Sequence, residues 1–333
     1  MINETYDLWT KLEYTYPVKG EFMPNVVSYI HDEDDVKRPA IIIVPGGGYC
    51  MVSPSEGEIV AMEFYHKGYN AFVVTYTTNL LMTTPLKMQA LKDLSKAVVF
   101  VRKNAEEFRV MADKISICGF SAGGHLCGSL AVHYDAEELI LEGEYEGISN
   151  RPNAVILSYP VISSGVYAHR GSFTALLGAN ATQEELDYMS LEKQVTKNTP
   201  ATFLWHTITD QAVPVENSYL FAEACKEQGV NVELHVFGNG GHGLSLANED
   251  WAKGNVGGDY TLDQYFETIQ YLADHHIELP PDLKWVGELQ GGVSVKEKVT
   301  ESMKQFTSSH QPDDGIAVWP LLTHNWLKKV LSI

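Results

Sequence analysis

A serine and two later polar residues have the types and the order that nucleophilic catalysis requires. Ser121 stands at the centre of residues 119–123, which read GFSAG and fit the G-x-S-x-G pattern. An apolar run precedes this pentapeptide and a helix-like segment follows it. Ser121 is therefore predicted to occupy a strained strand-to-helix turn that holds its hydroxyl above a sheet, where the helix N-terminus favours negative charge. The alternative is a glycine-rich turn with a passive serine.

Asp210 and His242 follow Ser121 in the order that such a site uses. Asp210 lies 89 residues after the serine in the run HTITDQAVP, and His242 lies 32 residues later in the run GNGGHGLS. Each follows a predicted strand, and open α/β sheets build their sites at the carboxyl ends of strands. We predict His242 as the base and Asp210 as its orienting acid, with a solvated loop aspartate as the alternative. Of the other histidines, His125 is expected to be a packed or hydrogen-bonded neighbour, and His206 to pack within a strand.

Backbone donors for an oxyanion are predicted from a second glycine cluster. Residues 46–49, GGGY, follow the first strong strand, and the N–H of Ala122 comes directly after the serine. Acyl transfer needs preorganised N–H donors, each worth about 3 kcal/mol. We predict that the loop at 46–49 and Ala122 supply them. Taken alone, three glycines also fit a flexible turn.

Strand-like and helix-like segments alternate, as expected for a mostly parallel central sheet with helices on both faces. The predicted strands are residues 40–44, 71–76, 114–118, 154–158, 202–206 and 232–237. Helices are predicted at about 55–67, from 85 onwards, from the serine to about 134, and at about 216–228. The first should open with a capping box of Ser55 and Glu58. The second should begin at Pro85 and carry one apolar stripe from Leu91 to Phe108.

Residues 248–315 interrupt this alternation. They contain pairs of glycines and prolines and one helical pattern near 262–272, and a final helix is predicted at 319–331. We predict a single domain over residues 1–333, in which 248–315 is an insertion before the C-terminal helix. Its apolar content is too thin to fold alone. Covering the site, forming a subunit contact and decorating the surface all stay open as its role.

Composition excludes several classes of partner. The 333 residues include 43 acidic and 24 basic side chains, a net charge of −19, so neither nucleic acid nor an anionic membrane surface is an expected partner. No run approaches the roughly 18–20 apolar residues of a membrane helix, and no signal peptide is evident, so the expected compartment is cytoplasmic. The four cysteines are expected to be free thiols, mostly buried. No metal-ligand motif or nucleotide loop is found, so neither metal nor cofactor is expected.

Four runs, in this order, resemble the serine esterases of the α/β-hydrolase fold: VPGGGY, GFSAGGHL, DQAVP and GGHGLS. The likeness is to bacterial acetyl esterases and acetylxylan-esterase-like or feruloyl-esterase-like members. It covers about Met23 to Leu246 and returns at the final helix, and SPSEGE, SYPVIS and HRGSF are also similar to that group. The resemblance implies the α/β-hydrolase fold, a triad and an oxyanion hole. The triad would be Ser121, Asp210 and His242, and the oxyanion donors would be Gly47, Gly48 and Ala122.

The expected activity is that of a carboxylic ester hydrolase working through an acyl-enzyme. Pro45 stands where hormone-sensitive-lipase-like members have the histidine of an HGGG motif, which points away from long-chain lipases. Short acyl esters are expected, acetyl above all, on a small molecule or an oligosaccharide. Tyr49 and Trp205 are expected to narrow the acyl pocket. A peptidase or amidase of the same fold and a catalytically silent binding protein are the alternatives, and a homo-oligomer stays open.

Overall fold

The described part of the chain builds one eight-stranded sheet; the computed structural model describes residues 1–275, 277, 294–300 and 310–333. The strands are β1 (Thr5–Asp7), β2 (Asn25–Tyr29), β3 (Arg38–Val44), β4 (Asn70–Thr75), β5 (Val110–Phe120), β6 (Ala154–Ser158), β7 (Ala201–Thr207) and β8 (Val232–Phe237). Their order across the sheet is β1-β2-β4-β3-β5-β6-β7-β8. Strands β3 to β8 are parallel, and β1 and β2 add an antiparallel edge. The carboxyl ends of the six parallel strands therefore meet at one edge.

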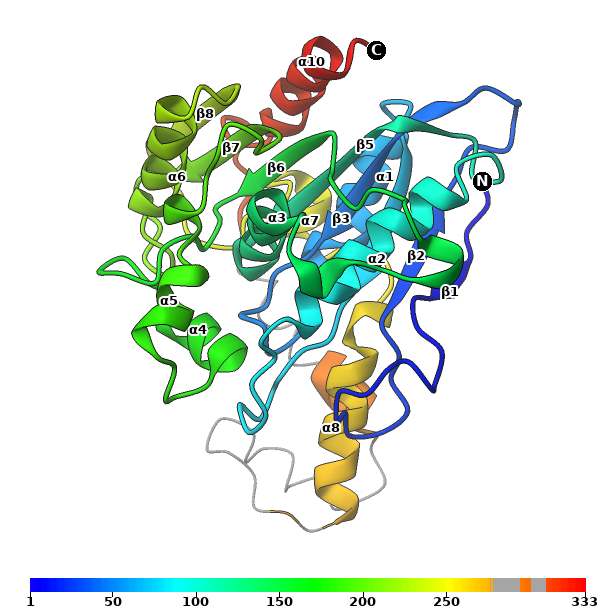
Figure 1. Ribbon diagram of the computed structural model, residues 1–333, viewed down its shortest axis with the longest axis vertical. Helices are drawn as coiled ribbons and strands as arrows, with labels where there is room; N and C mark the ends of the chain where they lie inside the picture. Colours follow the sequence, from blue (N-terminus) through cyan, green and yellow to red (C-terminus); the bar gives the residue numbers. More distant parts are fainter. Residues whose placement is uncertain (276, 278–293, 301–309) are drawn as a thin grey trace.

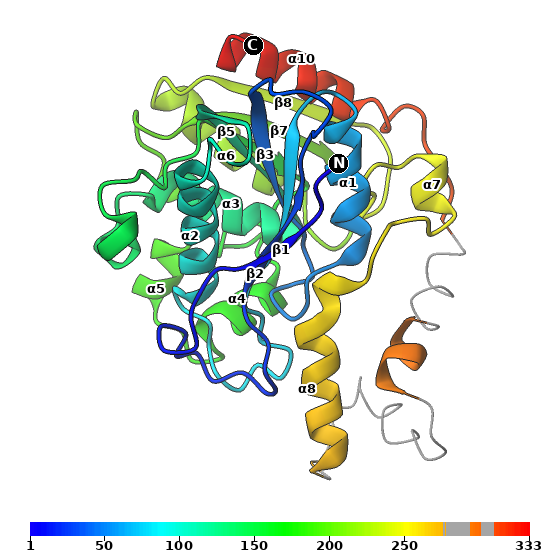
Figure 2. The ribbon, with the colours of Figure 1, turned by 90° about the vertical axis from the view of Figure 1, so that its right-hand side faces the viewer.

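Helices cover both faces of the sheet (Figures 1 and 2). On one face lie α1 (Glu58–Tyr65) and α10 (Trp319–Leu331); on the other lie α2 (Gln89–Lys103), α3 (Ser121–His133) and α6 (Glu216–Glu227). Each face has its own apolar core. Phe64, Trp205 and Trp319 fill the first core, and Leu94, Leu130 and Phe221 belong to the second. The predicted mostly parallel sheet with helices on both faces is confirmed.

Further helices and 3₁₀ turns lie between these elements. Between β6 and β7 lie α4 (Arg170–Leu177) and α5 (Gln183–Tyr188), and before α10 lie α7 (Glu249–Ala252) and α8 (Asp263–Asp274). Residues 295–300 are also helical. The 3₁₀ turns are η1 (Pro54–Glu56), η2 (Glu137–Leu139), η3 (Gly143–Tyr145), η4 (Leu191–Lys193) and η5 (Tyr260–Leu262).

All six predicted strands are present, but the two antiparallel strands at one side of the sheet, β1 and β2, were missed. β1 has three residues, two of them exposed, and β2 includes the polar Asn25 and Ser28. Neither segment is long or apolar enough to produce a periodic signal. Contact with the rest of the sheet decides their place: β2 pairs with β4, with Val26 opposite Val74, and β1 pairs with β2.

The predicted capping box of α1 is wrong. The N-cap of α1 is Gly57, without a side-chain hydrogen bond, and Ser55 lies in η1. Both predicted side chains are engaged elsewhere. The Ser55 hydroxyl bonds that of Ser53, and the Glu58 carboxylate accepts from the N–H of Gly258. A distant segment therefore takes the carboxylate that a local capping box would have used.

Helix α2 begins later than its sequence indicated. Pro85 does not start it; the helix begins at Gln89. Lys87 has a positive φ of 50°, and its N–H donates to the carbonyl of Leu176 at the end of α4. Pairing with α4 thus holds this segment out of helical conformation. The predicted apolar stripe also extends past the end of the helix, because Phe108 is buried although α2 ends at Lys103.

The predicted insertion at 248–315 is described only in part, because residues 276, 278–293 and 301–309 lie outside the described residues. Its two ends meet where the N–H of Asp313 donates to the carbonyl of Ala247 over 2.8 Å. Between them, α8 runs down beside the body of the molecule (Figure 2). The Gln264 side chain of α8 bonds the backbone of Thr78, and Glu267 accepts from the N–H of Phe22. This helix is therefore tied to the main body by polar contacts as well as by its apolar face.

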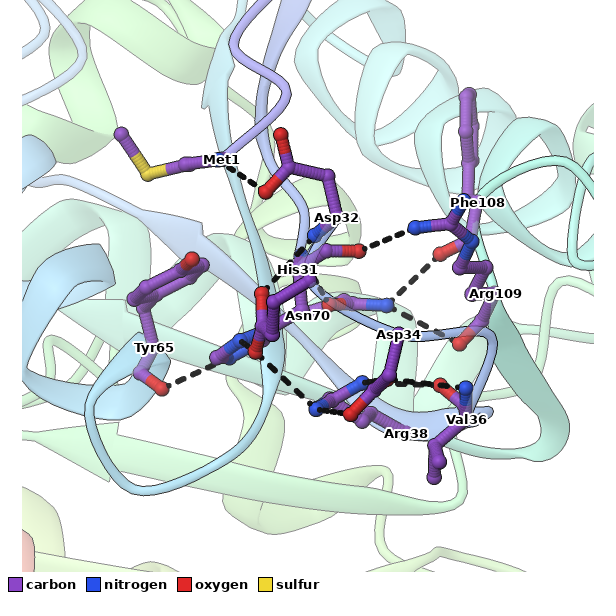
Figure 3. A network of polar contacts seen from close by, with 11 residues as sticks. Met1, His31, Asp32, Asp34, Val36, Arg38, Tyr65, Asn70, Phe108 and Arg109 are labelled. Atoms are coloured by element: carbon purple, nitrogen blue, oxygen red, sulfur yellow. Dashed lines mark hydrogen bonds and ion pairs between the residues drawn. The ribbon is translucent and has the colours of Figure 1, made fainter.

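A polar network closes the sheet at the amino ends of β3 and β4 (Figure 3). Buried Asn70, the first residue of β4, accepts from the N–H of His31 and donates to the carbonyls of Phe108 and Arg109. The Arg109 guanidinium donates back to the His31 carbonyl over 2.9 Å. These bonds satisfy backbone groups that would otherwise be buried without partners. They lie at the end of the sheet opposite the carboxyl ends of the parallel strands.

The turn from β5 to α3 brings backbone against backbone. Ser121, the first residue of α3, has a φ of 52°. A Cβ on Gly119 would lie 2.2 Å from the carbonyl oxygen of Gly123, and a Cβ on Gly123 would lie 2.1 Å from that of Val44. Residues two before and two after the serine therefore have no room for a side chain. This is the close packing that the G-x-S-x-G pattern predicted.

One side chain of helix α10 contacts both the sheet core and the loop after β8. Trp319 is fully buried, and its ring stacks on Trp205 at 5.3 Å and contacts Phe64 and Phe120. Its indole N–H donates to the carbonyl of Ser245 over 2.8 Å. The C-terminal helix thus holds the loop after β8 as well as the sheet.

Replacing Gly123 by alanine should strain the turn. The new Cβ would meet the backbone oxygens of Val44 and Pro45 at 2.1 and 2.4 Å, and overpacking of this kind costs about 1–3 kcal/mol or more. Urea unfolding should show this loss for Gly123→Ala. Gly238→Ala, where a Cβ meets nothing within 4 Å, is the matched control and should change stability by less than about 0.5 kcal/mol. Equal stability of the two variants would contradict the close packing.

Replacing Trp319 by alanine should destabilise the fold by about 3–5 kcal/mol, because a large buried aromatic side chain leaves a cavity. The measurement is the free energy of unfolding in urea. Leu321→Ala on the same helix is the control, since Leu321 is 53% exposed and should change stability by less than about 0.5 kcal/mol. A Trp319→Ala loss as small as that of the control would show that α10 is not anchored through this residue.

Candidate active site

The structure brings Ser121, His242 and Asp210 into one hydrogen-bonded row. The Ser121 hydroxyl lies 2.8 Å from His242 Nε2, and His242 Nδ1 lies 2.7 Å from Asp210 Oδ2. Ser121 comes from the turn between β5 and α3, Asp210 from the loop after β7, and His242 from the loop after β8. All three loops leave the carboxyl edge of the sheet. The three residues meet although 121 positions separate the serine from the histidine.

Asp210 is held as an ionised acceptor. Its Oδ1 accepts from the N–H groups of Ala212 and Val213, each over 2.9 Å, and its Oδ2 faces His242 and, at 3.4 Å, His206. Burial alone would raise the pKa of Asp210, but the hydrogen bonds from His206 and His242 outweigh it and hold that pKa well below its usual range. Because an ionised carboxylate can only accept, His242 Nδ1 donates and Nε2 is left to accept from the serine hydroxyl.

The loop at 46–49 abuts the serine. A Cβ on Gly46 would lie 2.7 Å from the carbonyl oxygen of Phe120 and 2.9 Å from Ser121 Cβ. Gly47 has a φ of 121° and reverses the chain, and its carbonyl accepts from the N–H groups of Cys50 and Met51. No described residue accepts from the N–H of Gly47 or Gly48. The N–H of Ala122 lies in the first turn of α3, where no intrahelical acceptor exists.

Tyr49 and Trp205 lie within the cores. Tyr49 is 1% exposed, and its hydroxyl bonds His125 Nδ1 over 2.8 Å. Trp205 is fully buried and donates its indole N–H to Ser158 Oγ over 2.7 Å. Both aromatic side chains therefore brace the loops and strands of the site from behind rather than presenting a free surface beside the serine.

Within the described part of the chain, neither alternative histidine bonds the serine, and the ring nitrogens of both have other partners. His206 also faces Asp210 at 3.4 Å. His125 bonds Tyr49 and the carbonyl of Met189, and burial lowers the pKa of His125 to about 4. His206 bonds Ser218 Oγ and the carbonyl of Val213. The expected roles of His125 as a hydrogen-bonded neighbour and of His206 as a packed strand residue are confirmed.

Three further polar residues lie near the row, and the sequence interpretation gave them no role. Glu56 is buried, Tyr159 has its ring 5.0 Å from that of His242, and His169 caps α4 through Ser172. Burial lowers the pKa of His169, and so does the charge of His242. The runs SPSEGE, SYPVIS and HRGSF carry these residues, and they were the available signal.

Three further features of the described residues concern metal binding, membrane spans and cysteines. Within the described ranges, no three His, Cys, Asp or Glu residues are grouped to hold a metal ion. No described helix is both long and apolar enough to cross a membrane. The four cysteines are free, and Cys118, Cys127 and Cys225 are buried, which confirms the expectation of mostly buried thiols.

Comparison with known proteins supports the same fold. The chain is 52% identical to endo-1,4-beta-xylanase B of Butyrivibrio fibrisolvens over 258 residues, which are 78% of this chain. It spans only 40% of that relative's length. The acetyl ester-xyloside bifunctional hydrolase from Caldicellulosiruptor lactoaceticus superimposes with a TM-score of 0.69 at 36% identity, covering 80% of this chain and 97% of that one. The α/β-hydrolase MGS-M1, from a deep-sea metagenome library, covers 100% of this chain and 99% of its own, with a TM-score of 0.62 and 26% identity.

These likenesses show that the sheet and its helices form an α/β-hydrolase fold. A family model described as BD-FAE matches residues 28–225, which include the glycine loop, the serine turn and the strand before Asp210. Because this match covers more than half of the 333 residues, the chain belongs to the BD-FAE family.

Proposed function

We propose that this protein is a serine esterase, a carboxylic ester hydrolase that works through an acyl-enzyme. The observation that carries the proposal is the row from Ser121 through His242 to Asp210, with distances of 2.8 and 2.7 Å. A serine becomes a nucleophile when an adjacent base takes its proton and an ionised acid orients that base. The relative named as an acetyl ester-xyloside bifunctional hydrolase supports the same reaction class.

In the proposed reaction, Ser121 Oγ attacks the carbonyl carbon of the ester while His242 Nε2 takes the hydroxyl proton. The N–H groups of Gly47, Gly48 and Ala122 donate to the oxyanion that forms. His242 then gives its proton to the alkoxy oxygen, the carbon–oxygen bond breaks and the alcohol leaves. A water molecule attacks the acyl-enzyme in the same way and releases the acid.

The site favours the transition state through charge that is already in place. Asp210 stays ionised and stabilises the imidazolium that forms at His242. Each preorganised N–H donor is worth about 3 kcal/mol when the carbonyl oxygen becomes negative. The backbone of Gly46 packs closely against the serine turn. This supports N–H donors that are already in position before the reaction begins.

We infer that the substrates are short acyl esters, acetyl above all, carried by a sugar or another small alcohol. The names of two relatives, a xylanase and an acetyl ester-xyloside bifunctional hydrolase, support acetylated xylose-containing oligosaccharides as one class.

We also propose one catalytic domain over residues 1–333, with 248–315 as an insertion. The meeting of Ala247 with Asp313 supports this, and so does the return of α10 to the sheet.

Ser121→Ala should lose activity by about 10⁶-fold in kcat, because the nucleophile is gone. His242→Ala should lose a similar amount, and Asp210→Asn about 10⁴-fold. The measurements are the burst of p-nitrophenol from p-nitrophenyl acetate and labelling by a fluorophosphonate. Ser129→Ala, a buried serine on the same helix, is the control and should keep both. A folded Ser121→Ala protein with more than a few per cent of activity would refute the assignment.

Acyl length should decide the rate across p-nitrophenyl acetate, butyrate, octanoate and palmitate. We expect kcat/KM to be highest for acetate and to fall steeply beyond butyrate. An apolar pocket gains only about 1–3 kcal/mol per methylene, so the preference must come from steric exclusion. Acetate release from acetylated xylo-oligosaccharides tests the alcohol side in parallel. A maximum at octanoate or palmitate would argue for a lipase-like pocket instead.

A further inference from the structure

Glu56 is a buried carboxylate for which the proposed reaction has no use. It lies in η1, between the glycine loop and α1, and is 4% exposed. Its Oε2 accepts from the N–H of Gly46 over 2.7 Å, and its Oε1 accepts from the hydroxyl of Tyr159 over 2.7 Å. No described lysine or arginine pairs with it. A charge buried in this way is costly unless each of its oxygens is satisfied.

Tyr159 continues the connection toward the base. It follows β6, is 1% exposed, and its hydroxyl oxygen accepts from the N–H of Ser245 over 2.9 Å. Ser245 stands three positions after His242, and the Tyr159 ring lies edge-on to the His242 ring at 5.0 Å. Ser245 is also tied to η1, because its hydroxyl donates to the carbonyl of Ser55 over 2.6 Å.

The direction of these hydrogen bonds selects the ionised form of Glu56. A backbone N–H can only donate, so Gly46 needs an acceptor. The Tyr159 oxygen already accepts from Ser245, so its single proton goes to Glu56. Each carboxylate oxygen therefore meets a donor. Among the described residues, no acceptor is found for the hydrogen of a neutral Glu56 acid, whereas both oxygens of the carboxylate meet donors.

We propose that Glu56 is a positioning residue that locks the oxyanion loop to the loop of the catalytic histidine, through Gly46 on one side and through Tyr159 and Ser245 on the other. This rests on the proposed esterase function. A second effect follows from its charge. Tyr159 bonds Glu56 through its hydroxyl and has its ring 5.0 Å from that of His242, so a single side chain links the carboxylate to the base. When His242 takes the serine proton, the charge of Glu56 favours the imidazolium, and Glu56 therefore contributes in the transition state more than in the resting enzyme.

Burial makes the charge of Glu56 sensitive to pH, and four titratable groups among the described residues face it. They are Tyr159 after β6, Tyr76 after β4, Cys118 on β5 and His242 after β8. Burial raises the pKa of Glu56, and the hydrogen bonds from Tyr159 and Gly46 together with the His242 charge only partly offset it. As the pH falls, Glu56 is therefore neutralised above the usual range of a glutamate. Both its hold on Gly46 and its support of the imidazolium are then lost.

The test compares Glu56→Gln with the wild type and with Asp93→Asn. The glutamine keeps the shape but loses the charge, and its amide cannot accept from both Gly46 and Tyr159. Asp93 is a matched control, a fully buried carboxylate that accepts from Thr77, Gln89 and Trp9, with a pKa raised by burial to about 6. Wild-type turnover and fluorophosphonate labelling at Ser121 are measured first, so that failure of the esterase proposal is seen separately.

For Glu56→Gln, we expect kcat on p-nitrophenyl acetate to fall about 10- to 100-fold, the loss typical of a slightly misplaced site, with KM within about threefold. The acid limb of the kcat profile should move to lower pH, because the charge that favours the imidazolium is gone. Asp93→Asn should leave the position of that limb unchanged. A folded Glu56→Gln enzyme with wild-type kcat, or with a reduced kcat and an unmoved limb, would overturn the proposal.

Tyr159→Phe is the second test of the positioning role, and it tests that role on its own if Glu56→Gln does not fold. It removes the hydroxyl between Glu56 and Ser245 but keeps the ring against His242 and the Glu56 charge. In the wild type this hydroxyl lowers the pKa of Glu56, so its loss raises that pKa. We therefore expect a lower kcat and an acid limb that does not move to lower pH, unlike that of Glu56→Gln. The double variant Glu56→Gln/Tyr159→Phe should lose less than the product of the single losses, because both act through one connection. Full activity of a folded Tyr159→Phe enzyme would overturn the positioning role.

Discussion

The close approach of α3 to β3 and β5 is the constraint on which the rest of the molecule depends. Gly123 lies against the carbonyl oxygens of Val44 and Pro45, and Gly119 lies against Gly123 itself. This contact sets the height of Ser121 above the sheet and its positive φ of 52°. It also places the glycine loop, which begins directly after Pro45, beside the serine. One backbone contact thus brings Ser121 and the glycine loop together, as the proposed acyl transfer requires.

Two buried carboxylates flank this contact and differ in their partners. Asp210 faces two histidines and two backbone N–H groups, and its pKa lies well below the usual range. Glu56 faces a backbone N–H and a tyrosine hydroxyl, and its pKa is raised by burial. Environments that push the pKa values of neighbouring acids apart allow each to do different work. In the proposed reaction Asp210 orients the base directly, whereas the proposed role of Glu56 is to join the loops that surround it.

The rest of the fold supplies rigidity at both ends of the parallel strands. At their amino ends, Asn70 joins three backbone segments. At their carboxyl ends, Trp319 of α10 donates to the carbonyl of Ser245 and so holds the loop after β8. The described part of the insertion adds α8, which bonds Thr78 after β4. Of these contacts, the bond from Trp319 fixes the loop that carries His242, which suits the preorganised site that we propose.

Local patterns in the sequence determined the frame and the order of the site. The parallel strands β3 to β8 could be predicted from short segments rich in apolar residues. The final helix was predicted at its observed limits, 319–331. The order of Ser121, Asp210 and His242 could be assigned because parallel strands bring their carboxyl ends to one edge of the sheet. These signals are local: strand and helix periodicity, turn residues, and a chain order imposed by topology.

Tertiary structure alone decided where side chains without a local pattern point. Glu56 and Tyr159 meet across 103 positions, and no spacing rule connects them. Tyr49 follows the glycines closely, but its φ of 62° and its bond to His125 turn it into the core. Trp205 faces α10 because of its place in the alternation of β7. The capping box of Ser55 and Glu58 failed for the same reason, since Gly258 competes for the carboxylate. Long-range contacts of this kind form only when the chain packs, so their partners cannot be read from neighbouring residues.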